Sequence, residues 1–192
     1  QRFEAEPDLV LLGAAAEYID EGGRRLRVVR FPGEHEMLLE RLPLGNPILH
    51  PTVMLRCEAA LAAGGYPHDF SYAQDLALWL RLMRRGRAGN MPETLVKLRV
   101  HASQATRDAR LREVRLEDNL RLAREMEAMD ELPGQVRDAA RLRQAFMLWG
   151  LGRRSEAWEV LRKRGPRWMA GCLANPVAWR AGWSLLDTRL RG

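Results

Sequence analysis

The 192-residue chain contains few cysteines, and its two, Cys57 and Cys172, are far apart and belong to no C-x-x-C pair. That usage predicts neither a zinc site nor a disulfide scaffold and favours a reducing compartment. The sequence also lacks a run of about 18 uncharged apolar residues, so it predicts no membrane-spanning helix. Its first residues show no basic start followed by an apolar stretch, so no signal peptide is expected. These absences favour a cytoplasmic protein.

The first half of the chain has no excess of charge of either sign. Residues 1–102 contain 13 Lys and Arg against 13 Asp and Glu, whereas residues 103–192 contain 18 against 12. The net charge of +6 therefore resides entirely in the second part, which predicts that the two parts have different roles. No recognised nucleic-acid-binding motif accompanies the basic residues, so a nucleic-acid partner is not expected.

The first hundred residues show the patterns of an α/β domain. Apolar runs and apolar/basic alternation indicate strands, glycines and prolines separate them, and shorter stretches have helical spacing. We expect Met37, Leu38 and Leu42 to face inward from the first of these helices. The predicted elements are strands over 9–19 and 26–31 joined by a glycine turn, a helix over 34–42, a buried strand over 48–55, a helix over 58–63 and a strand over 92–100.

The remaining residues have helical spacing throughout. They are rich in Arg, Ala and Leu, and Pro-Gly, Gly-x-Gly, Gly-Pro and Asn-Pro pairs interrupt them. The sequence thus predicts two domains, an α/β part over 1–103 and an all-helical region over 104–192. The predicted helices cover 104–130, 135–150, 153–164 and roughly 166–190.

A glycine-rich turn that leads into a helix, over residues 64–86, is the most informative stretch. Ser71 and Gln74 have the spacing of a capping box, in which their side chains satisfy free N–H groups at a helix start. Asp75 then lies in the first turn, near the positive end of the helix dipole. An apolar stripe follows on one face, so the helix can pack on a core while its start faces a cleft. The stripe consists of Leu76, Trp79, Leu80 and Met83.

Four segments in a fixed order resemble the family 2 glycosyltransferases of the GT-A fold. That family has a glycine-containing acceptor loop, an x-Glu-Asp motif that opens a helix, and a histidine after the last core strand. The resemblance covers roughly residues 1–106, and the order of its segments is more specific than any one of them. The segments are Asn46-Pro-Ile-Leu-His-Pro-Thr-Val-Met-Leu-Arg56, Gly64-Gly65-Tyr66, Gln74-Asp75-Leu-Ala-Leu-Trp-Leu-Arg81 and Leu98-Arg-Val-His101.

The resemblance implies an inverting, non-processive transfer of sugar from a nucleotide-sugar donor to a glycan or lipid-linked acceptor, as in cell-surface polysaccharide synthesis. Asp75 would be the catalytic base that takes the proton of the acceptor hydroxyl. His101 would help to hold a divalent cation, Mn²⁺ or Mg²⁺, that bridges the donor phosphates. The residues expected to contact the acceptor are Gly64, Gly65, Gln74, Asn46 and His50.

Each of these residues also has a purely structural interpretation. Asp75 could serve only as a dipole partner in a first helical turn. His101 could simply form hydrogen bonds at a strand end, and Gly64-Gly65 before Tyr-Pro could be an ordinary turn. For Asn46 and His50, satisfaction of local backbone groups is the simpler interpretation.

Two departures from the family pattern bear on the prediction. Gln74 stands where the family has a glutamate, although the following aspartate is kept. No Asp-x-Asp occurs in the sequence, whereas the family carries this metal-binding motif in an N-terminal, nucleotide-binding half. The chain therefore resembles the acceptor-side portion of a longer enzyme, with most of the cation ligands expected from the other half.

The basic C-terminal region allows a second kind of function. From residue 137 onward 12 Lys and Arg stand against 4 Asp and Glu, with five tryptophans interleaved. Such a region suits peripheral contact with an anionic membrane, at the inner face of the plasma membrane, where a lipid-linked acceptor would be presented. The alternatives are that the tryptophans pack helix against helix, or that the whole chain is a non-catalytic binding or scaffold module that docks a partner.

Overall fold

The computed structural model describes residues 1–101, 108–163 and 165, which form two compact units. The first unit contains Gln1–Leu42, Asn46–Phe70 and Gln74–Asp108. The second contains Pro43–Gly45, Ser71–Ala73 and the chain from Ala109 onward. The first is a mixed α/β unit, as the sequence predicts for this part of the chain, and the second is helical in its described residues.

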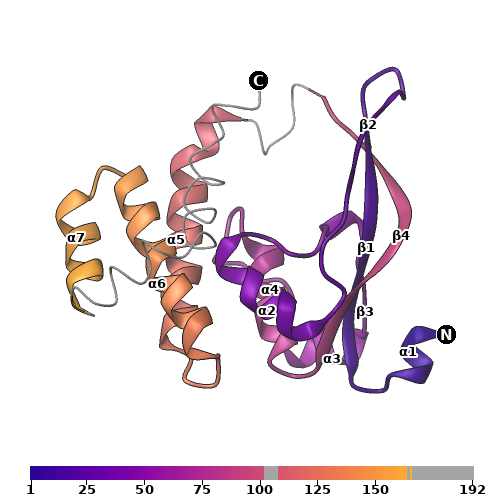
Figure 1. Ribbon diagram of the computed structural model, residues 1–192, viewed down its shortest axis with the longest axis horizontal. Helices are drawn as coiled ribbons and strands as arrows, with labels where there is room; N and C mark the ends of the chain where they lie inside the picture. The colour runs from indigo at the N-terminus through magenta and orange to yellow at the C-terminus, as the bar shows by residue number, and fades with distance from the viewer. Residues whose placement is uncertain (102–107, 164, 166–192) are drawn as a thin grey trace. The chain divides into compact units, whose positions relative to one another are not determined.

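A four-stranded mixed sheet forms the first unit (Figure 1), with the long strand β1, Leu9–Ile19, at its centre. The strands β2, Arg25–Val29, and β3, Met54–Leu55, pair with it antiparallel, and β4, Arg87–Arg99, runs parallel to it from Leu9 to Ile19. The hairpin predicted around the Asp20–Gly23 turn is confirmed. Most of β1 is buried, which explains why its sequence is a nearly continuous apolar run.

The helices of this unit are α1, Arg2–Ala5, α2, His35–Arg41, α3, Cys57–Ala62, and α4, Gln74–Met83. Figure 1 shows α2, α3 and α4 on one side of the sheet, and α4 contacts both β1 and β4. The predicted apolar stripe of α4 is confirmed, because Leu76, Trp79, Leu80 and Met83 are all buried. This packing fixes α4 to the sheet and so fixes the place of its first turn.

The predicted strand over 48–55 is largely wrong. Its first part contains the 3₁₀ helix η2, His50–Thr52, and only β3 remains as strand. Pro51 has no N–H to donate to a sheet ladder, which favours the tight turn. The side chain of Thr52 takes the place of a ladder partner, accepting from the Ala14 amide at 3.0 Å and donating to the Leu49 carbonyl at 2.7 Å.

Two smaller predictions for this unit are also wrong. Met37 does not face inward, since 51% of it is exposed, whereas Leu38 and Leu42 are fully buried as predicted. The capping box would start the central helix directly after Ser71, but α4 begins at Gln74. Asp75 still lies in the first turn, as the sequence predicts.

The helical unit contains the short η4, Ala109–Leu111, and the helices α5, Arg112–Ala128, α6, Gly134–Gly150, and α7, Arg154–Arg162. Leu120, Met147, Leu148 and Ala157 form a core between them. The helices predicted over 135–150 and 153–164 are confirmed, and the one predicted over 104–130 begins only at Arg112. The helix predicted over 166–190 lies outside the described residues.

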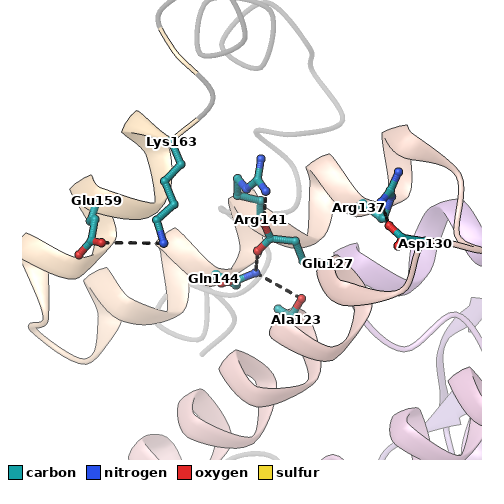
Figure 2. Close-up of polar contacts among 8 residues, drawn as sticks. All are labelled: Ala123, Glu127, Asp130, Arg137, Arg141, Gln144, Glu159 and Lys163. Atoms are coloured by element: carbon teal, nitrogen blue, oxygen red, sulfur yellow. Dashed lines mark hydrogen bonds and ion pairs between the residues drawn. The ribbon is translucent and has the colours of Figure 1, made fainter.

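Polar side chains connect the helices of this unit (Figure 2). Glu127 of α5 accepts from both Arg141 and Gln144 of α6, and Gln144 also donates to the Ala123 carbonyl at 3.4 Å. Arg137 pairs with Asp130 at 2.6 Å. Along α7, the Lys163 ammonium lies 3.8 Å from Glu159. The carboxylates drawn in Figure 2 are therefore matched by cations.

One buried carboxylate in the helical unit binds backbone instead. Asp118 of α5, 9% exposed, accepts from the amides of Tyr72 and Ala73 at 2.5 and 3.1 Å. These amides belong to the residues directly before α4 and have no helical partner of their own. Asp118 thus does for this segment what the capping box was expected to do.

Two tryptophans of the helical unit do not pack into its core. Trp149 is 48% exposed and Trp158 is 51% exposed, and the Arg154 guanidinium lies over the Trp149 ring at 5.3 Å. About half of each side chain is therefore covered, and the interpretation that the tryptophans pack helix against helix stays a prediction. Trp168, Trp179 and Trp183 lie outside the described residues. Within the described part of the chain, no helix combines the length and the apolar character that crossing a membrane requires.

Candidate active site

Asp75, in the first turn of α4, is held by two hydrogen bonds. Its Oδ1 accepts from the Leu76 amide at 2.7 Å, and its Oδ2 accepts from the side-chain amide of Asn46 at 2.7 Å. No Lys or Arg of the described residues forms an ion pair with it. The carboxylate is therefore oriented without being neutralised by a cation.

Burial raises the pKa of the Asp75 carboxyl above its ordinary value. The Leu76 hydrogen bond, the nearby His50, the residue's own amide and the Asn46 hydrogen bond each act in the opposite direction. A carboxylate with a raised pKa is a stronger base than a fully solvated one. A proton acceptor must be ionised, point in a fixed direction and have an incomplete water shell. The hydrogen bonds fix the direction of the Asp75 carboxylate, and its burial removes part of the water shell.

Asn46 is held in turn by its own segment. Its side-chain oxygen accepts from the Ile48 amide at 3.1 Å, which closes an Asx-type turn over Pro47. The buried Asn90 of β4 donates to the carbonyl of Pro47 at 3.1 Å and to that of Pro32 at 2.9 Å. The interpretation of Asn46 as a local backbone partner is confirmed, and its amide has a second role that the sequence did not predict, on Asp75.

Glycine at position 13 of β1, which has no side chain, lets the Asn46–Ile48 segment approach the sheet. A Cβ added at Gly13 of β1 would lie 2.2 Å from the Asn90 side-chain oxygen and 2.7 Å from Cγ2 of Ile48. Such contacts do not occur between real atoms, so a larger residue at position 13 would force the side chains of Asn90 and Ile48 to move. Gly13 therefore supports Asn46, and through Asn46 the Asp75 carboxylate, although it is distant from both in sequence.

Three aromatic side chains lie together, and one of them, Trp79, is on the same helix as Asp75. The Nε2 atom of His50 is 2.9 Å from the Tyr66 hydroxyl, with the two rings 5.7 Å apart. Trp79, fully buried, lies 5.8 Å from the His50 ring and 6.4 Å from the Tyr66 ring. His50 and Tyr66 are themselves exposed. The sequence predicted that Trp79 is buried in the core, and this is confirmed. Its contacts with the His50 and Tyr66 rings were not predicted.

The Gly64-Gly65 turn has a local structural reason. Both residues have positive φ, +85° and +67°, and they end α3 as a Schellman motif. The Gly64 amide donates to the Leu61 carbonyl at 3.0 Å, and the Gly65 amide donates to the Ala60 carbonyl at 2.9 Å. This turn directs the chain into Tyr66. Nothing within 4 Å would meet a Cβ at either glycine, so the predicted contact with an acceptor stays a prediction.

Two buried polar atoms on α4 have no partner in the structure. They are Oε1 of Gln74, beside Asp75 in sequence, and the indole Nε1 of Trp79. Buried polar groups are normally hydrogen-bonded, and exceptions concentrate where a ligand or water binds. The predicted role of Gln74 in acceptor binding is consistent with this environment and stays a prediction.

His101 is exposed and lies just beyond β4. The Val100 amide donates to the Ile19 carbonyl at 2.8 Å, whereas the Asn46–Ile48 segment packs near Gly13, about 20 Å away along the strand. Among the described residues, no three His, Cys, Asp or Glu side chains gather in a way that could hold a metal ion. The described residues do not fit a divalent cation, and the predicted role of His101 stays a prediction.

Comparisons with known proteins give two matches of interest. The chain is 36% identical over 98 residues to the amylovoran biosynthesis glycosyltransferase AmsE of Erwinia amylovora, a match covering 50% of this chain and 36% of that protein. It is 33% identical over 76 residues to an uncharacterized glycosyltransferase of Haemophilus influenzae, covering 38% of this chain and 23% of the other. No protein-family model matches the chain. The chain thus spans about a third of the length of the first relative and less than a quarter of the second, and over those parts it is similar to glycosyltransferases.

Proposed function

We propose that this chain is the acceptor-side portion of an inverting, non-processive glycosyltransferase of family 2 and that Asp75 is its general base. The single observation that carries the proposal is the Asp75 carboxylate, which two hydrogen bonds orient and burial makes more basic, and which forms no ion pair with a Lys or Arg of the described residues. The similarity to two glycosyltransferases supports the reaction class. The name of the Erwinia protein suggests polysaccharide synthesis as the setting.

The proposed step is a single displacement. As the acceptor hydroxyl oxygen attacks the anomeric carbon, its proton passes to an oxygen of Asp75, and the bond from that carbon to the leaving diphosphate breaks with its electron pair. Asn46 and the Leu76 amide keep the carboxylate oriented during this transfer. A carboxylate fixed before the reaction begins needs no reorganisation when the proton moves.

The donor side of the reaction lies outside the described residues. We propose a nucleotide sugar as donor and a glycan or lipid-linked sugar as acceptor. A divalent cation, Mn²⁺ or Mg²⁺, would supply positive charge to the leaving diphosphate, mainly through a GT-A-type donor-binding part that this chain does not contain. The described residues do not form a site for this cation, so the proposed proton transfer to Asp75 does not involve it.

The basic region from residue 137 onward belongs to a separate proposal. The half-exposed Trp149 and Trp158 favour a surface that contacts another body, and we propose the inner face of the plasma membrane. This would place the protein in the cytoplasm beside a lipid-linked acceptor. Sedimentation of the chain with liposomes tests it: binding that rises with the anionic lipid fraction supports the proposal, and equal recovery without anionic lipid contradicts it.

The central test of the proposed function replaces the native gene by an Asp75→Asn allele in its own host. Loss of a general base should reduce the transfer rate by about 10²–10⁴-fold. Incorporation of labelled sugar into cell-surface polysaccharide measures it. Asp8→Asn, at an exposed aspartate before β1, is the matched control and should leave incorporation unchanged.

The purified Asp75→Asn chain should also melt close to the wild-type temperature, because relief of the buried charge offsets the one hydrogen bond that an amide nitrogen cannot accept. Because burial raises the pKa of Asp75, its ionised form is less stable in the folded chain than in the unfolded one, so removing the charge does not destabilise the fold at neutral pH. Full sugar incorporation by a stably expressed Asp75→Asn protein would refute the assignment.

A further inference from the structure

Tyr66 has an exposed ring whose position is nevertheless fixed. It is 41% exposed and follows the glycine turn that ends α3. Its hydroxyl lies 2.9 Å from Nε2 of His50, and its ring makes T-shaped contacts with the His50 and Trp79 rings at 5.7 and 6.4 Å. Trp79 is fully buried in α4 and cannot move without disturbing the core. Tyr66 is therefore open to solvent and yet held in one orientation.

The other two tyrosines of the chain have a cation over their rings. The Arg27 guanidinium lies 4.9 Å from the centre of the Tyr18 ring, and the Arg115 guanidinium lies 5.5 Å from that of Tyr72. No Lys or Arg of the described residues lies over Tyr66, and its two ring contacts, at 69° and 66°, are far from flat stacking. Tyr66 therefore offers aromatic surface that a flat ligand can cover.

Two segments in contact connect this aromatic cluster to Asp75. On α4, Trp79 follows Asp75 by four residues, so the two lie on one face about 6 Å apart along the helix axis. In the segment before β3, His50 follows Asn46 by four residues. The Asn46 amide donates to Asp75 at 2.7 Å, and the His50 ring lies 5.8 Å from the Trp79 ring. The segment thus contacts the helix at both places, which puts the cluster one helical turn after the carboxylate.

A sugar ring matches these surroundings. A pyranose has C–H groups on its faces and hydroxyls around its edge, so it can lie against an aromatic ring while its hydroxyls reach polar groups. Binding sites for small molecules commonly combine aromatic side chains with a few placed polar groups. Here the polar groups are the His50 imidazole, the Tyr66 hydroxyl and the Asp75 carboxylate.

A nucleotide base could also stack on a tyrosine, but the charges around this one disfavour it. A nucleotide brings phosphates, and the Asp75 carboxylate forms no ion pair with a Lys or Arg of the described residues. Its charge would therefore repel the phosphates. An uncharged sugar meets no such repulsion.

We propose that Tyr66, held by His50 and Trp79, is the residue on which the acceptor sugar stacks, and that the ligand is an uncharged pyranoside. Because the ring is already fixed, little side-chain freedom is lost when the sugar binds. A sugar on Tyr66 would present a hydroxyl toward Asp75, one helical turn away. The identification of this sugar as the acceptor rests on the proposed function, whereas the binding of a pyranoside to Tyr66 does not.

Saturation-transfer NMR on the full 192-residue chain tests the binding without a donor. The probes are methyl β-D-glucopyranoside, methyl β-D-galactopyranoside and sorbitol, which has hydroxyls but no ring. At least one pyranoside should receive saturation from the wild-type chain, and sorbitol should receive none. Tyr66→Ala should weaken pyranoside binding about tenfold, and Tyr66→Phe, which keeps the aromatic ring, no more than about threefold.

Leu95→Ala is the matched control. It removes an apolar side chain of β4 that is 61% exposed, and pyranoside binding should equal that of wild type. The Tyr66 ring protons of the wild-type chain, assigned by their loss in Tyr66→Phe, provide a second readout that does not depend on the folding of Tyr66→Ala. Their signals should shift as the pyranoside is added.

Three results would overturn the proposal. The first is the absence of saturation transfer to both pyranosides in the wild-type chain. The second is equal transfer in wild type and in a folded Tyr66→Ala chain, or Tyr66 signals that do not move. The third is tighter Tyr66-dependent binding of uridine 5′-monophosphate than of either pyranoside, because the ring would then serve a nucleotide base.

Transfer activity separates this proposal from the proposed function. Sugar incorporation in the host should fall about tenfold in Tyr66→Ala when the acceptor is below saturation, and Tyr66→Phe should restore most of it. The Asp75→Asn chain should still bind the pyranoside. Full incorporation in Tyr66→Ala with loss in Asp75→Asn would refute the stacking role alone. Full incorporation in Asp75→Asn with Tyr66-dependent pyranoside binding would refute the proposed function and leave the sugar site standing.

Discussion

Two shielded carboxylates, Asp118 of the helical unit and Asp75 of the α/β unit, have different surroundings. In the helical unit, Glu127 accepts from Arg141 and Gln144, and Asp118 accepts from two backbone amides. In the α/β unit, Asp75 is oriented by amides and forms no ion pair with a Lys or Arg of the described residues. The first arrangement holds the fold together, while the second leaves a group available for chemistry.

The difference shows why burial alone does not identify a functional group. Asp118 is more deeply buried than Asp75, but its hydrogen bonds already use it for structure. Asp75 combines partial burial, a raised pKa and neighbours that are exposed rings. A perturbed group is a functional candidate when its surroundings are incompletely satisfied. The predictions that follow test this comparison on residues outside the candidate site.

Asp118→Ala should have the largest structural effect. It leaves the amides of Tyr72 and Ala73 without their acceptor, and Ala73 is buried, so the free energy of unfolding should fall by about 1–3 kcal/mol. Urea unfolding measures it. Glu113→Ala, an exposed residue of the same helix, is the control and should change stability little. An unchanged midpoint for Asp118→Ala would remove the contrast with Asp75.

His35 should cause a pH dependence of stability in the α/β unit. Its Nδ1 accepts from the Ala88 amide at 3.1 Å, and burial lowers its pKa below the ordinary value. The unfolded chain therefore takes up a proton below about pH 6.5 while the folded chain does not, so stability falls as the pH drops through this range. Above it, the histidine is neutral in both states and has no effect.

Thermal melts between pH 5 and pH 7.5 test this prediction. His35→Gln should flatten the decline on the acid side, because a glutamine side chain cannot take up a proton yet offers an acceptor to Ala88. His68→Gln, at an exposed position, should retain the wild-type slope. Equal slopes for all three chains would show that His35 is not the cause.

Asp130→Asn should have the smallest effect. Its ion pair with Arg137 is short, at 2.6 Å, but the Asp130 side chain is 96% exposed. Water and salt screen such pairs, so the melting temperature should stay within about 1 °C of wild type. A clear loss of stability would show that the helical unit depends on its surface charges more than on its apolar core.

The sequence predicted the elements whose periodicity is strong. The β1–β2 hairpin, α4 with its buried stripe, and the two helices α6 and α7 all follow from apolar spacing and from glycine and proline boundaries. The prediction of a strand from Ile48 to Leu55 was wrong, because an apolar composition cannot distinguish a strand from a 3₁₀ turn that packs on one.

Sequence patterns could not predict contacts between residues that are distant in sequence. Asp75 was singled out because the start of a helix is a local feature, whereas the Asn46 contact joins residues 29 apart. Tyr66 and Asn90 were missed as site residues for the same reason. Tyr66 had one usable signal, its place directly after two glycines, but its contact with His50 depends on how α3 ends.

Gly13 shows how an absent side chain governs the candidate base. Because a single methyl group there would collide with the side chains of Asn90 and Ile48, a larger residue in β1 would displace two side chains that pack on the turn carrying Asn46. Anyone who randomises this protein to alter its chemistry should therefore treat Gly13 as part of the site and keep it fixed. A variant library that spares only the residues touching Asp75 would disturb the candidate base through a position in the middle of the sheet.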